Sequence, residues 1–454
     1  MTISLALIFN KLILIVLGII VLGVLVFIHE LGHFLVAKWC GIRVLAFSLG
    51  FGTPIIKKEF RGTEYRISVI PFGGYVKMAG ENPEEDKEGA PDEFSSKPVW
   101  QRALVAVAGP AANFFSALLM LWFMFIWGVE KPLYLEHSVV GAVMEQSAAE
   151  LAGIKAGDSI TAINKKTVNS WDDIGSAFAL QDKEYTLSYI RDGQKYSALL
   201  AMKKSDELIP KEHMGGIMPP LPAIVATVSP NSPAERAGIQ KGDTIKTINS
   251  QKVYSWFQVL TFIKTYDTTE KKPLTITVAR DSSLVSLSTS PEYDAGSKRY
   301  IIGIMVDEGA KRIVKYPVVA AFHKGMEKGW EYTTMIFDII GKLVSREVST
   351  KQLAGPVGII PMSGGMALQG LSAILNFMGL IGINLAVLNL MPLVITDGGM
   401  LLFLGLEAIR RKPLSIKTQM LFNKVAIAFF LMLFLFVTFN DVQRLPEYFR
   451  LFGK

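Results

Sequence analysis

The sequence predicts a multi-pass α-helical membrane protein with four transmembrane helices and a membrane-associated β element, plus two tandem extracytoplasmic domains of mixed α and β structure. Composition supports the membrane part, because half of the 454 residues are hydrophobic and the mean hydropathy of +0.35 is high for a soluble protein of this length. An internal repeat in the polar middle of the chain supports the second part.

Four apolar stretches are long enough to be considered as membrane spans. The first also has features of a signal peptide, since Lys11 precedes a long apolar run. We favour a retained span, because the run lacks a clear small-residue cleavage site and leads straight into His29 and Glu30. The four stretches cover residues 12–28, 103–129, 371–406 (interrupted by polar residues) and 425–439.

Basic side chains gather in two loops, one between the first two spans and one after the third. The positive-inside rule places both loops in the cytoplasm, and the N-terminus, the middle of the chain and the C-terminus outside. The net charge of +7 is therefore explained most simply by topology, rather than by binding of nucleic acid or anionic lipid. These residues are Arg43, Lys57, Lys58, Arg61, Arg66, Lys77, Lys87, Lys97, Arg102, Arg410, Arg411, Lys412, Lys417 and Lys424.

The single cysteine, Cys40, limits the chemistry of the chain. No intramolecular disulfide is possible, so an extracytoplasmic domain must fold on its hydrophobic core alone. A zinc site cannot be built from several thiolates either, so a metal ion has to be held by histidine and carboxylate side chains.

The repeat reads Ser-x-Ala-Glu-x-Ala-Gly-Ile-x-x-Gly-Asp-x-Ile-x-x-Ile-Asn, and its two copies begin at Ser147 and Ser232. This pattern predicts a short helix ended by glycine, a Gly-Asp turn and then a strand. It resembles the PDZ domain of bacterial proteases, in two units over residues 133–217 and 218–310. PDZ domains bind extended peptides by strand addition, although such units can also serve as spacers. The recurring pairs are Gly153 and Gly238, Gly157 and Gly242, Asp158 and Asp243, Asn164 and Asn249, and Trp171 and Trp256.

The segment that indicates chemistry is His29-Glu30-Leu31-Gly32-His33, at the end of the first span. Residues four apart lie on the same face of a helix, so both imidazoles can point at one metal ion. Glu30 lies beside that site, where it can take a proton from an attacking water. Zinc fits, because it accepts histidine nitrogen and leaves a position open in catalytic sites. A lone histidine in a span is more often a packed core residue, but two histidines and a glutamate on one turn favour a metal.

A third protein ligand is expected to be an acidic residue on another span, and Asp397 is the candidate. It belongs to the segment that starts with Asn389 and Pro392 and ends with Gly398-Gly399. A carboxylate with apolar sequence on both sides needs a charge partner, and zinc would be one. The Asn, Pro and Gly-Gly residues predict a broken helix, which is tolerated at membrane depth only beside protein or a water-filled cavity. The alternative is a helix-packing motif with a protonated aspartate.

Together these motifs resemble the site-2 protease family of intramembrane zinc metalloproteases, and within it the bacterial regulator-of-sigma-E protease group. The resemblance covers nearly the whole chain, since the His-Glu-x-x-His, the Asn-x-x-Pro and Asp-Gly motif and the PDZ-like units occur in the same order. Further segments that carry it are 48–52, 62–65, 70–78 and 108–113.

The resemblance implies a role for each matching residue. One zinc ion per chain would be held by His29, His33 and Asp397, and Glu30 would be the general base. The strand-like run 65–78 would be a re-entrant β element that clamps an unwound substrate. The implied substrate-binding residues are Asn389, Pro392, Gly50, Gly52 and Tyr75. The chain departs from the family at Val394, Thr396 and Met400, where Pro, an aliphatic residue and His are common.

The function implied by the resemblance is hydrolysis of peptide bonds within the transmembrane segments of pre-trimmed single-span proteins. Substrates would be anti-sigma factors of an envelope stress response, and also remnant signal peptides; no nucleic-acid partner is expected. The enzyme would lie in the bacterial inner membrane, with the PDZ units in the periplasm and the active site towards the cytoplasm. A membrane-anchored scaffold with a silent metal site is one alternative. A transporter is another, although the spans contain no inverted repeat.

The predicted domain organisation has five parts. They are an N-terminal membrane domain with two spans and the β element (1–132), two PDZ domains (133–217 and 218–310), an extracytoplasmic amphipathic helical region (311–370) and a C-terminal membrane domain (371–454).

Overall fold

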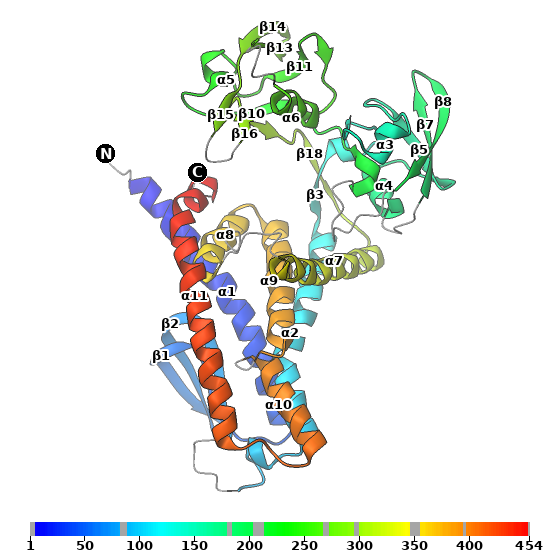
Figure 1. The fold of residues 1–454 in the computed structure, drawn as a ribbon. Coiled ribbons are helices and arrows are strands. Elements are labelled where there is room, and N and C mark those ends of the chain that lie inside the picture. The colour runs from blue at the N-terminus through cyan, green and yellow to red at the C-terminus, as the bar shows by residue number, and fades with distance from the viewer. Residues whose placement is uncertain are drawn as a thin grey trace. The chain divides into compact units, whose positions relative to one another are not determined.

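The computed structural model describes residues 5–81, 89–178, 184–202, 213–266, 272–294, 299–345, 355–393 and 396–452 (Figure 1). The chain divides into two compact units. The first joins Met1–Val129 to Val314–Lys454 and contains the apolar helices; the second, Glu130–Ile313, contains most of the strands. This division agrees with the predicted class, a helical membrane protein with a β-containing second part.

Four of the described helices are long and apolar enough to cross a membrane. Length and composition alone define these candidates, so the number of spans stays a prediction. The helices are α1 (Leu5–Trp39), α2 (Val99–Trp127), α9 (Leu371–Leu390) and α11 (Ile416–Phe452).

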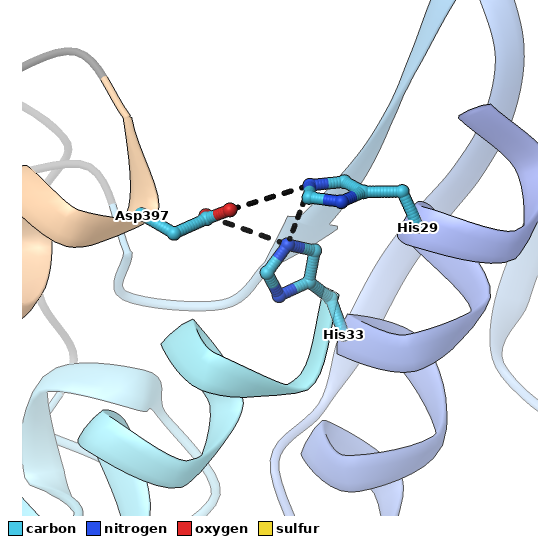
Figure 2. A group of neighbouring side chains, drawn as sticks. All are labelled: His29, His33 and Asp397. Atoms are coloured by element: carbon cyan, nitrogen blue, oxygen red, sulfur yellow. Dashed lines mark hydrogen bonds and ion pairs between the residues drawn. The ribbon is translucent and has the colours of Figure 1, made fainter. Parts of the chain in front are cut away.

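The third apolar stretch is broken, as its Asn, Pro and Gly residues predict. Helix α9 ends at Leu390 and α10 (Asp397–Arg410) begins seven residues later, so the predicted break in the helix is confirmed. Pro392 is the cause, because a proline excludes the residue before it from the helical region. Met391 accordingly has an extended backbone, with φ −63° and ψ 144°. After the turn, the start of α10 lies beside the end of α1 (Figure 2).

Glycines allow α1 to pack closely against its neighbours. A Cβ on Gly32 would lie 2.3 Å from the carbonyl oxygen of Ala108 on α2. A Cβ on Gly364 of the short helix α8 (Pro356–Leu368) would lie 2.1 Å from the carbonyl oxygen of Leu14 on α1. Small residues of this kind let helix backbones approach each other in a membrane. Helix α1 is thereby packed against both α2 and α8.

Two further contacts fix the remaining helices of this unit. Asp441 of α11 is fully buried and accepts the backbone N–H groups of Gly355 and Gly358, at 3.0 and 2.8 Å, where α8 begins. This carboxylate pairs backbone N–H groups that have no partner within the helix, at its N-terminus.

Helix α7 (Val318–Val344) is joined to α9 by a hydrogen bond, in which the Tyr332 hydroxyl donates to Oδ1 of Asn376 at 2.7 Å. The extracytoplasmic position of 311–370 stays a prediction.

The β element consists of strands β1 (Val44–Phe60) and β2 (Thr63–Met78). β2 folds over β1, because residues 46–49 of β1 are paired on both sides, with 74–77 and with 64–67. The last part of β2 reaches helix α1, where Gly74 lies against Val26. The end of β2 therefore runs along the helix that carries the two histidines.

The second unit contains two sheets with the same local plan. In the first, the strand order is β6-β5-β7-β8; in the second, β17-β10-β11-β13-β14, with β12 beside β11. The elements of the first copy are β3 (Val129–Pro132), β4 (Ala142–Val143), α3 (Ala148–Leu151), β5 (Ser159–Ile163), β6 (Lys166–Thr167), α4 (Trp171–Phe178), β7 (Glu184–Arg191), β8 (Gln194–Ala201) and β9 (Ile217–Met218). Those of the second are β10 (Ile224–Val228), α5 (Pro233–Arg236), β11 (Thr244–Ile248), β12 (Gln251–Lys252), α6 (Trp256–Lys264), β13 (Leu274–Arg280), β14 (Ser283–Thr289), β15 (Glu292–Asp294), β16 (Arg299–Ile301), β17 (Ile304–Asp307) and β18 (Lys311–Val314).

The sequence repeat corresponds to a repeat of hydrogen bonds. Arg191 binds Asp158 with both a 2.6 and a 2.7 Å contact and also donates to the carbonyl of Gly153. Arg280 binds Asp243 in the same way, with two contacts of 2.7 Å. Each copy therefore ties its Gly-Asp turn to the end of one strand, β7 in the first copy and β13 in the second. One fold is built twice, while its identity as a PDZ domain stays a prediction.

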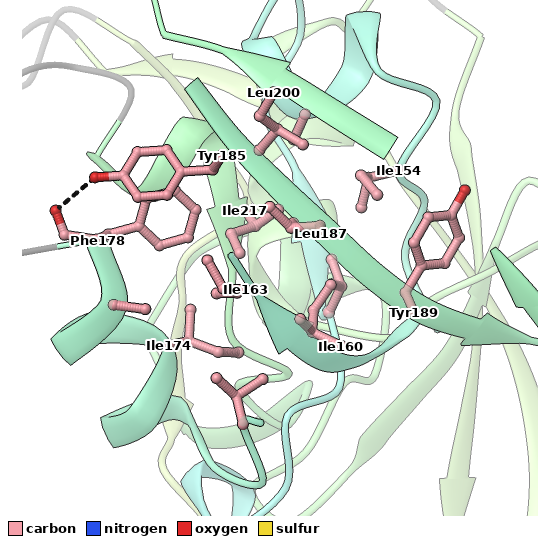
Figure 3. Packing of buried hydrophobic residues seen from close by; sticks show 14 of the residues in the cluster. Ile154, Ile160, Ile163, Ile174, Phe178, Tyr185, Leu187, Tyr189, Leu200 and Ile217 are labelled. Carbon is pink, nitrogen blue, oxygen red and sulfur yellow. Dashed lines mark hydrogen bonds between the residues drawn. The ribbon is translucent and has the colours of Figure 1, made fainter. Parts of the chain in front are cut away.

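Each copy also has its own hydrophobic core. In the first, the inward side chains of β5 and β7 pack against α4 (Figure 3). The indole of Trp171 is buried and donates to the carbonyl of Val139 at 2.9 Å. Since Trp256 occupies the matching place in the second core, each copy closes on itself without a disulfide.

Candidate metal centre

The last turns of α1 bring two imidazoles together. His29 and His33 lie on one face of the helix, as their spacing predicts, and their Nε2 atoms are 3.2 Å apart. His33 is buried at 9% exposure, and the side chain of His29 is 13% exposed. Both rings point towards the start of α10 (Figure 2).

Asp397 completes a group of three. Its Oδ2 lies 3.3 Å from Nε2 of His29, and its Oδ1 lies 3.4 Å from Nε2 of His33. A tetrahedral zinc ion with bonds of about 2.1 Å keeps its ligand atoms about 3.4 Å apart. These separations and the donor types therefore fit a zinc ion with a fourth position open. Among the described residues, this is the group of histidine, cysteine and acidic side chains that could hold a metal.

The turn before Asp397 is closed by one of the residues that departs from the family pattern. The hydroxyl of Thr396 lies 2.9 Å from the carbonyl oxygen of Met391 and 2.8 Å from that of Leu393. An aliphatic residue could not make either bond, so this chain closes the turn with a hydroxyl. Gly398 is needed in the same turn, because a Cβ there would lie 2.2 Å from the Met391 carbonyl oxygen.

Of the other two residues that depart from the family pattern, the structure describes only Met400. Met400 packs against the apolar cluster that includes Phe47 and Val76, so it fills space beside the β element. Val394 lies outside the described residues.

Glu30 lies beside the three side chains and against the β element. Its carboxylate accepts the backbone N–H of Val76 and interacts electrostatically with both histidines and Asp397. Gly74 leaves room for it, because a Cβ there would lie 3.1 Å from Cγ of Glu30. A glutamate held in this way has the position of a base next to a metal.

The predicted substrate-binding residues fall into two groups. Asn389, at the end of α9, joins the centre, since its amide nitrogen lies 3.5 Å from Nε2 of His29. Pro392 forms the turn that follows. The others belong to the β element, and their described contacts are within it. Gly50 and Gly52 have left-handed backbones on β1 (φ 86° and 87°), and the Tyr75 hydroxyl accepts from Arg66 on β2.

Sequence reasoning missed the groups that hold the histidines from behind. Nδ1 of His33 donates to the carbonyl of Val105 at 2.7 Å, and Nδ1 of His29 faces the Asn113 amide at 3.3 Å. Gly109 lies between them, where a Cβ would be 2.2 Å from Nε2 of His33. The available signal was a polar asparagine within an apolar span. A backbone carbonyl gives no signal in a sequence.

Two imidazoles, a carboxylate and a neighbouring glutamate among apolar helices define a metallohydrolase of the membrane. Comparison with known proteins gives the family: residues 17–433 match the sequence model of Peptidase family M50, and the chain belongs to this family. It is thus a zinc metalloprotease.

Curated relatives agree in length as well as in sequence. The chain is 34% identical to the regulator of sigma-E protease RseP of Escherichia coli K12 over 448 residues. It is 33% identical to the regulator of sigma E protease of Salmonella typhi over 447 residues. A Pasteurella multocida protein that is provisionally named a zinc metalloprotease is 34% identical over 446 residues. Each match covers 94% of this chain and 98% of the relative.

Proposed function

We propose that this enzyme is an intramembrane protease that cleaves the transmembrane segments of pre-trimmed single-span proteins. One zinc ion per chain is held by His29, His33 and Asp397, and Glu30 is the general base. The observation that carries the proposal is the convergence of two imidazole nitrogens and one carboxylate, at distances of 3.2–3.4 Å, from helices far apart in the sequence.

The roles of the protein side chains follow from their positions. Zinc, when bound here, supplies a Lewis acid that polarises the scissile carbonyl and lowers the pKa of water. Glu30 takes a proton from the attacking water on its carboxylate and delivers it to the leaving amine. The N–H of Val76 holds that carboxylate in one orientation. The amide of Asn389, next to His29, helps to hold the substrate near the metal.

The β element is proposed to bind the substrate as an added strand. A transmembrane helix hides its own peptide bonds, so the target must be extended before it can be cut. An extended peptide can satisfy its backbone groups by pairing with a sheet edge. The end of β2 supports this role, because the residues from Gly74 to Val76 lie against Glu30. Gly50, Gly52 and Tyr75 would shape this part of the clamp.

The second unit is proposed to consist of two PDZ domains in the periplasm that exclude substrates with bulky outer domains. The repeated turn, salt bridge and core of the two copies support a common fold. The names of the relatives, regulators of a sigma factor, support anti-sigma factors as substrates, and remnant signal peptides are a second class. Four spans in the bacterial inner membrane, with the centre towards the cytoplasm, agree with the basic loops.

Cleavage by the purified protein tests this proposal. The substrate is a single-span anti-sigma-factor fragment without its outer domain, incubated with wild type, Glu30→Gln and the control Glu327→Gln, each with and without a zinc chelator. We expect wild type and Glu327→Gln to cleave, and both to stop on chelation, while Glu30→Gln stays folded and inactive. Cleavage by Glu30→Gln would refute the assigned base. A folded wild-type protein that contains no zinc and does not cleave would favour a membrane-anchored scaffold.

A further inference from the structure

Helix α2 holds the two histidine rings from the side opposite Asp397. The Val105 carbonyl faces Nδ1 of His33 at 2.7 Å, and the Asn113 amide faces Nδ1 of His29 at 3.3 Å. Both rings therefore present Nε2 to the carboxylate of Asp397. The same helix supplies both partners, two turns apart.

The bond to Val105 fixes the tautomer of His33. A carbonyl oxygen only accepts hydrogen bonds, so Nδ1 of His33 carries the hydrogen. Its Nε2 atom then keeps a lone pair, which is what a metal ligand needs. Ligand histidines usually donate their other N–H to such a partner.

The Asn113 amide is in a different situation. The residue is 1% exposed, and its Oδ1 has no hydrogen-bond partner among the described residues. Buried amide oxygens are normally paired. With its nitrogen towards His29, the amide would donate to Nδ1, and the hydrogen of the neutral ring would have to lie on Nε2. The ring could then not bind a metal through the atom that faces Asp397.

A half turn of the amide pairs the buried oxygen and corrects the tautomer of His29, while the amide nitrogen takes the place that the oxygen had. The oxygen and nitrogen of an asparagine amide have nearly the same shape, and the hydrogen-bond network decides between them. After the turn, Oδ1 accepts from Nδ1–H of His29, and Nε2 keeps its lone pair. The buried oxygen has a donor, and His29 has the same tautomer as His33.

We propose that Asn113 is a positioning residue that accepts Nδ1–H of His29 through Oδ1 and so holds Nε2 of that ring ready to bind the metal. The inference rests on the proposed function, because it takes His29 as a zinc ligand. Of the two partners on α2, Asn113 is the one that a side-chain substitution can remove.

Zinc affinity of the purified full chain, measured by competition with a chelator, tests the proposal. Asn113→Asp keeps an acceptor of the same shape, and Asn113→Leu removes it with little change in volume. The matched control is Asn376→Leu, which removes an amide that accepts from Tyr332 instead. We expect Asn113→Leu to weaken zinc binding by about 10- to 100-fold, and Asn113→Asp and Asn376→Leu to bind like wild type.

A spectroscopic measurement reports the tautomer itself. The chain has five histidines, so ¹⁵N-histidine labelling gives few signals, and His29→Ala assigns the one of interest. Without zinc and with the ring neutral, we expect the hydrogen on Nδ1 of His29 in wild type and Asn113→Asp. A loss of packing alone would not change this protonation pattern. It also provides the test if Asn113→Leu fails to fold.

Three results would overturn the proposal. Wild-type affinity in Asn113→Leu would show that His29 needs no acceptor there. Loss of zinc in Asn113→Asp, or an unprotonated Nδ1 in wild type, would show that Asn113 does not accept from this ring. The proposed metal site itself fails only if His29→Ala binds zinc like wild type, and that outcome is separate from the first three.

Discussion

Gly109 faces His33 so closely that a single methyl group should disable the metal centre. A Cβ on Gly109 would lie 2.2 Å from Nε2 of His33, whereas ordinary contact begins at 3.4 Å. The ring of His33 must therefore retreat by about 1 Å, and a displacement of that size in an active site costs about 100-fold in activity. Gly109→Ala should accordingly lower zinc affinity and cleavage by about 100-fold or more.

The assay is zinc competition combined with cleavage of a single-span substrate. Gly23→Ala is the matched control, because it places the same methyl group in a membrane helix with nothing within 4 Å. Since alanine favours a helix more than glycine does, the control should be as stable as wild type or more so. Wild-type zinc affinity in a folded Gly109→Ala protein would refute the reasoning, because His33 could then not be the ligand at that position.

Three further predictions concern contacts that support the fold. Arg102 on α2 binds Glu407 on α10 through two hydrogen bonds. Arg102→Met should therefore destabilise the protein by about 3–5 kcal/mol, because it leaves the Glu407 carboxylate without its partner. The double variant Arg102→Met with Glu407→Met should recover most of this loss, as measured by a double-mutant cycle of thermal unfolding. Thr396→Val should cost about 1 kcal/mol of stability, and equal stability would contradict the assigned bonds. Burial raises the pKa of Asp243, but Arg280 and the N–H of Gln240 outweigh it, so that the pKa lies below its usual value. The stabilisation is therefore present above the unfolded pKa of about 3.9 and is lost as pH falls through the folded value; Asp243→Asn should remove this dependence from hydrogen exchange of β11 and β13.

The sequence predicted the parts of the site that depend on short spacing. His29 and His33 share a helix face because they are four residues apart. The break between α9 and α10 follows from Pro392, which no helix interior accommodates easily. The two copies in the second unit were also recognisable, because Gly-Asp turns are determined locally. Membership of the M50 family and zinc metalloprotease activity are confirmed.

The remainder depended on contacts between residues far apart in the chain. No local signal indicated that residues 46–49 would be paired on both sides, or that α8 would pack against α1 through Gly364. Asn113 was part of a segment that carried the family resemblance, yet its place behind His29 depends on the register of two helices. The PDZ identity, the domain boundaries and the substrate stay predictions.

The central claim is that His29, His33 and Asp397 hold one zinc ion. The most direct test is the zinc content of the purified chain, compared with that of Asp397→Asn and of the control Asp338→Asn on α7. One zinc ion per chain in wild type and in the control, with loss in Asp397→Asn, is the predicted result. Full zinc content in a folded Asp397→Asn protein would contradict the account.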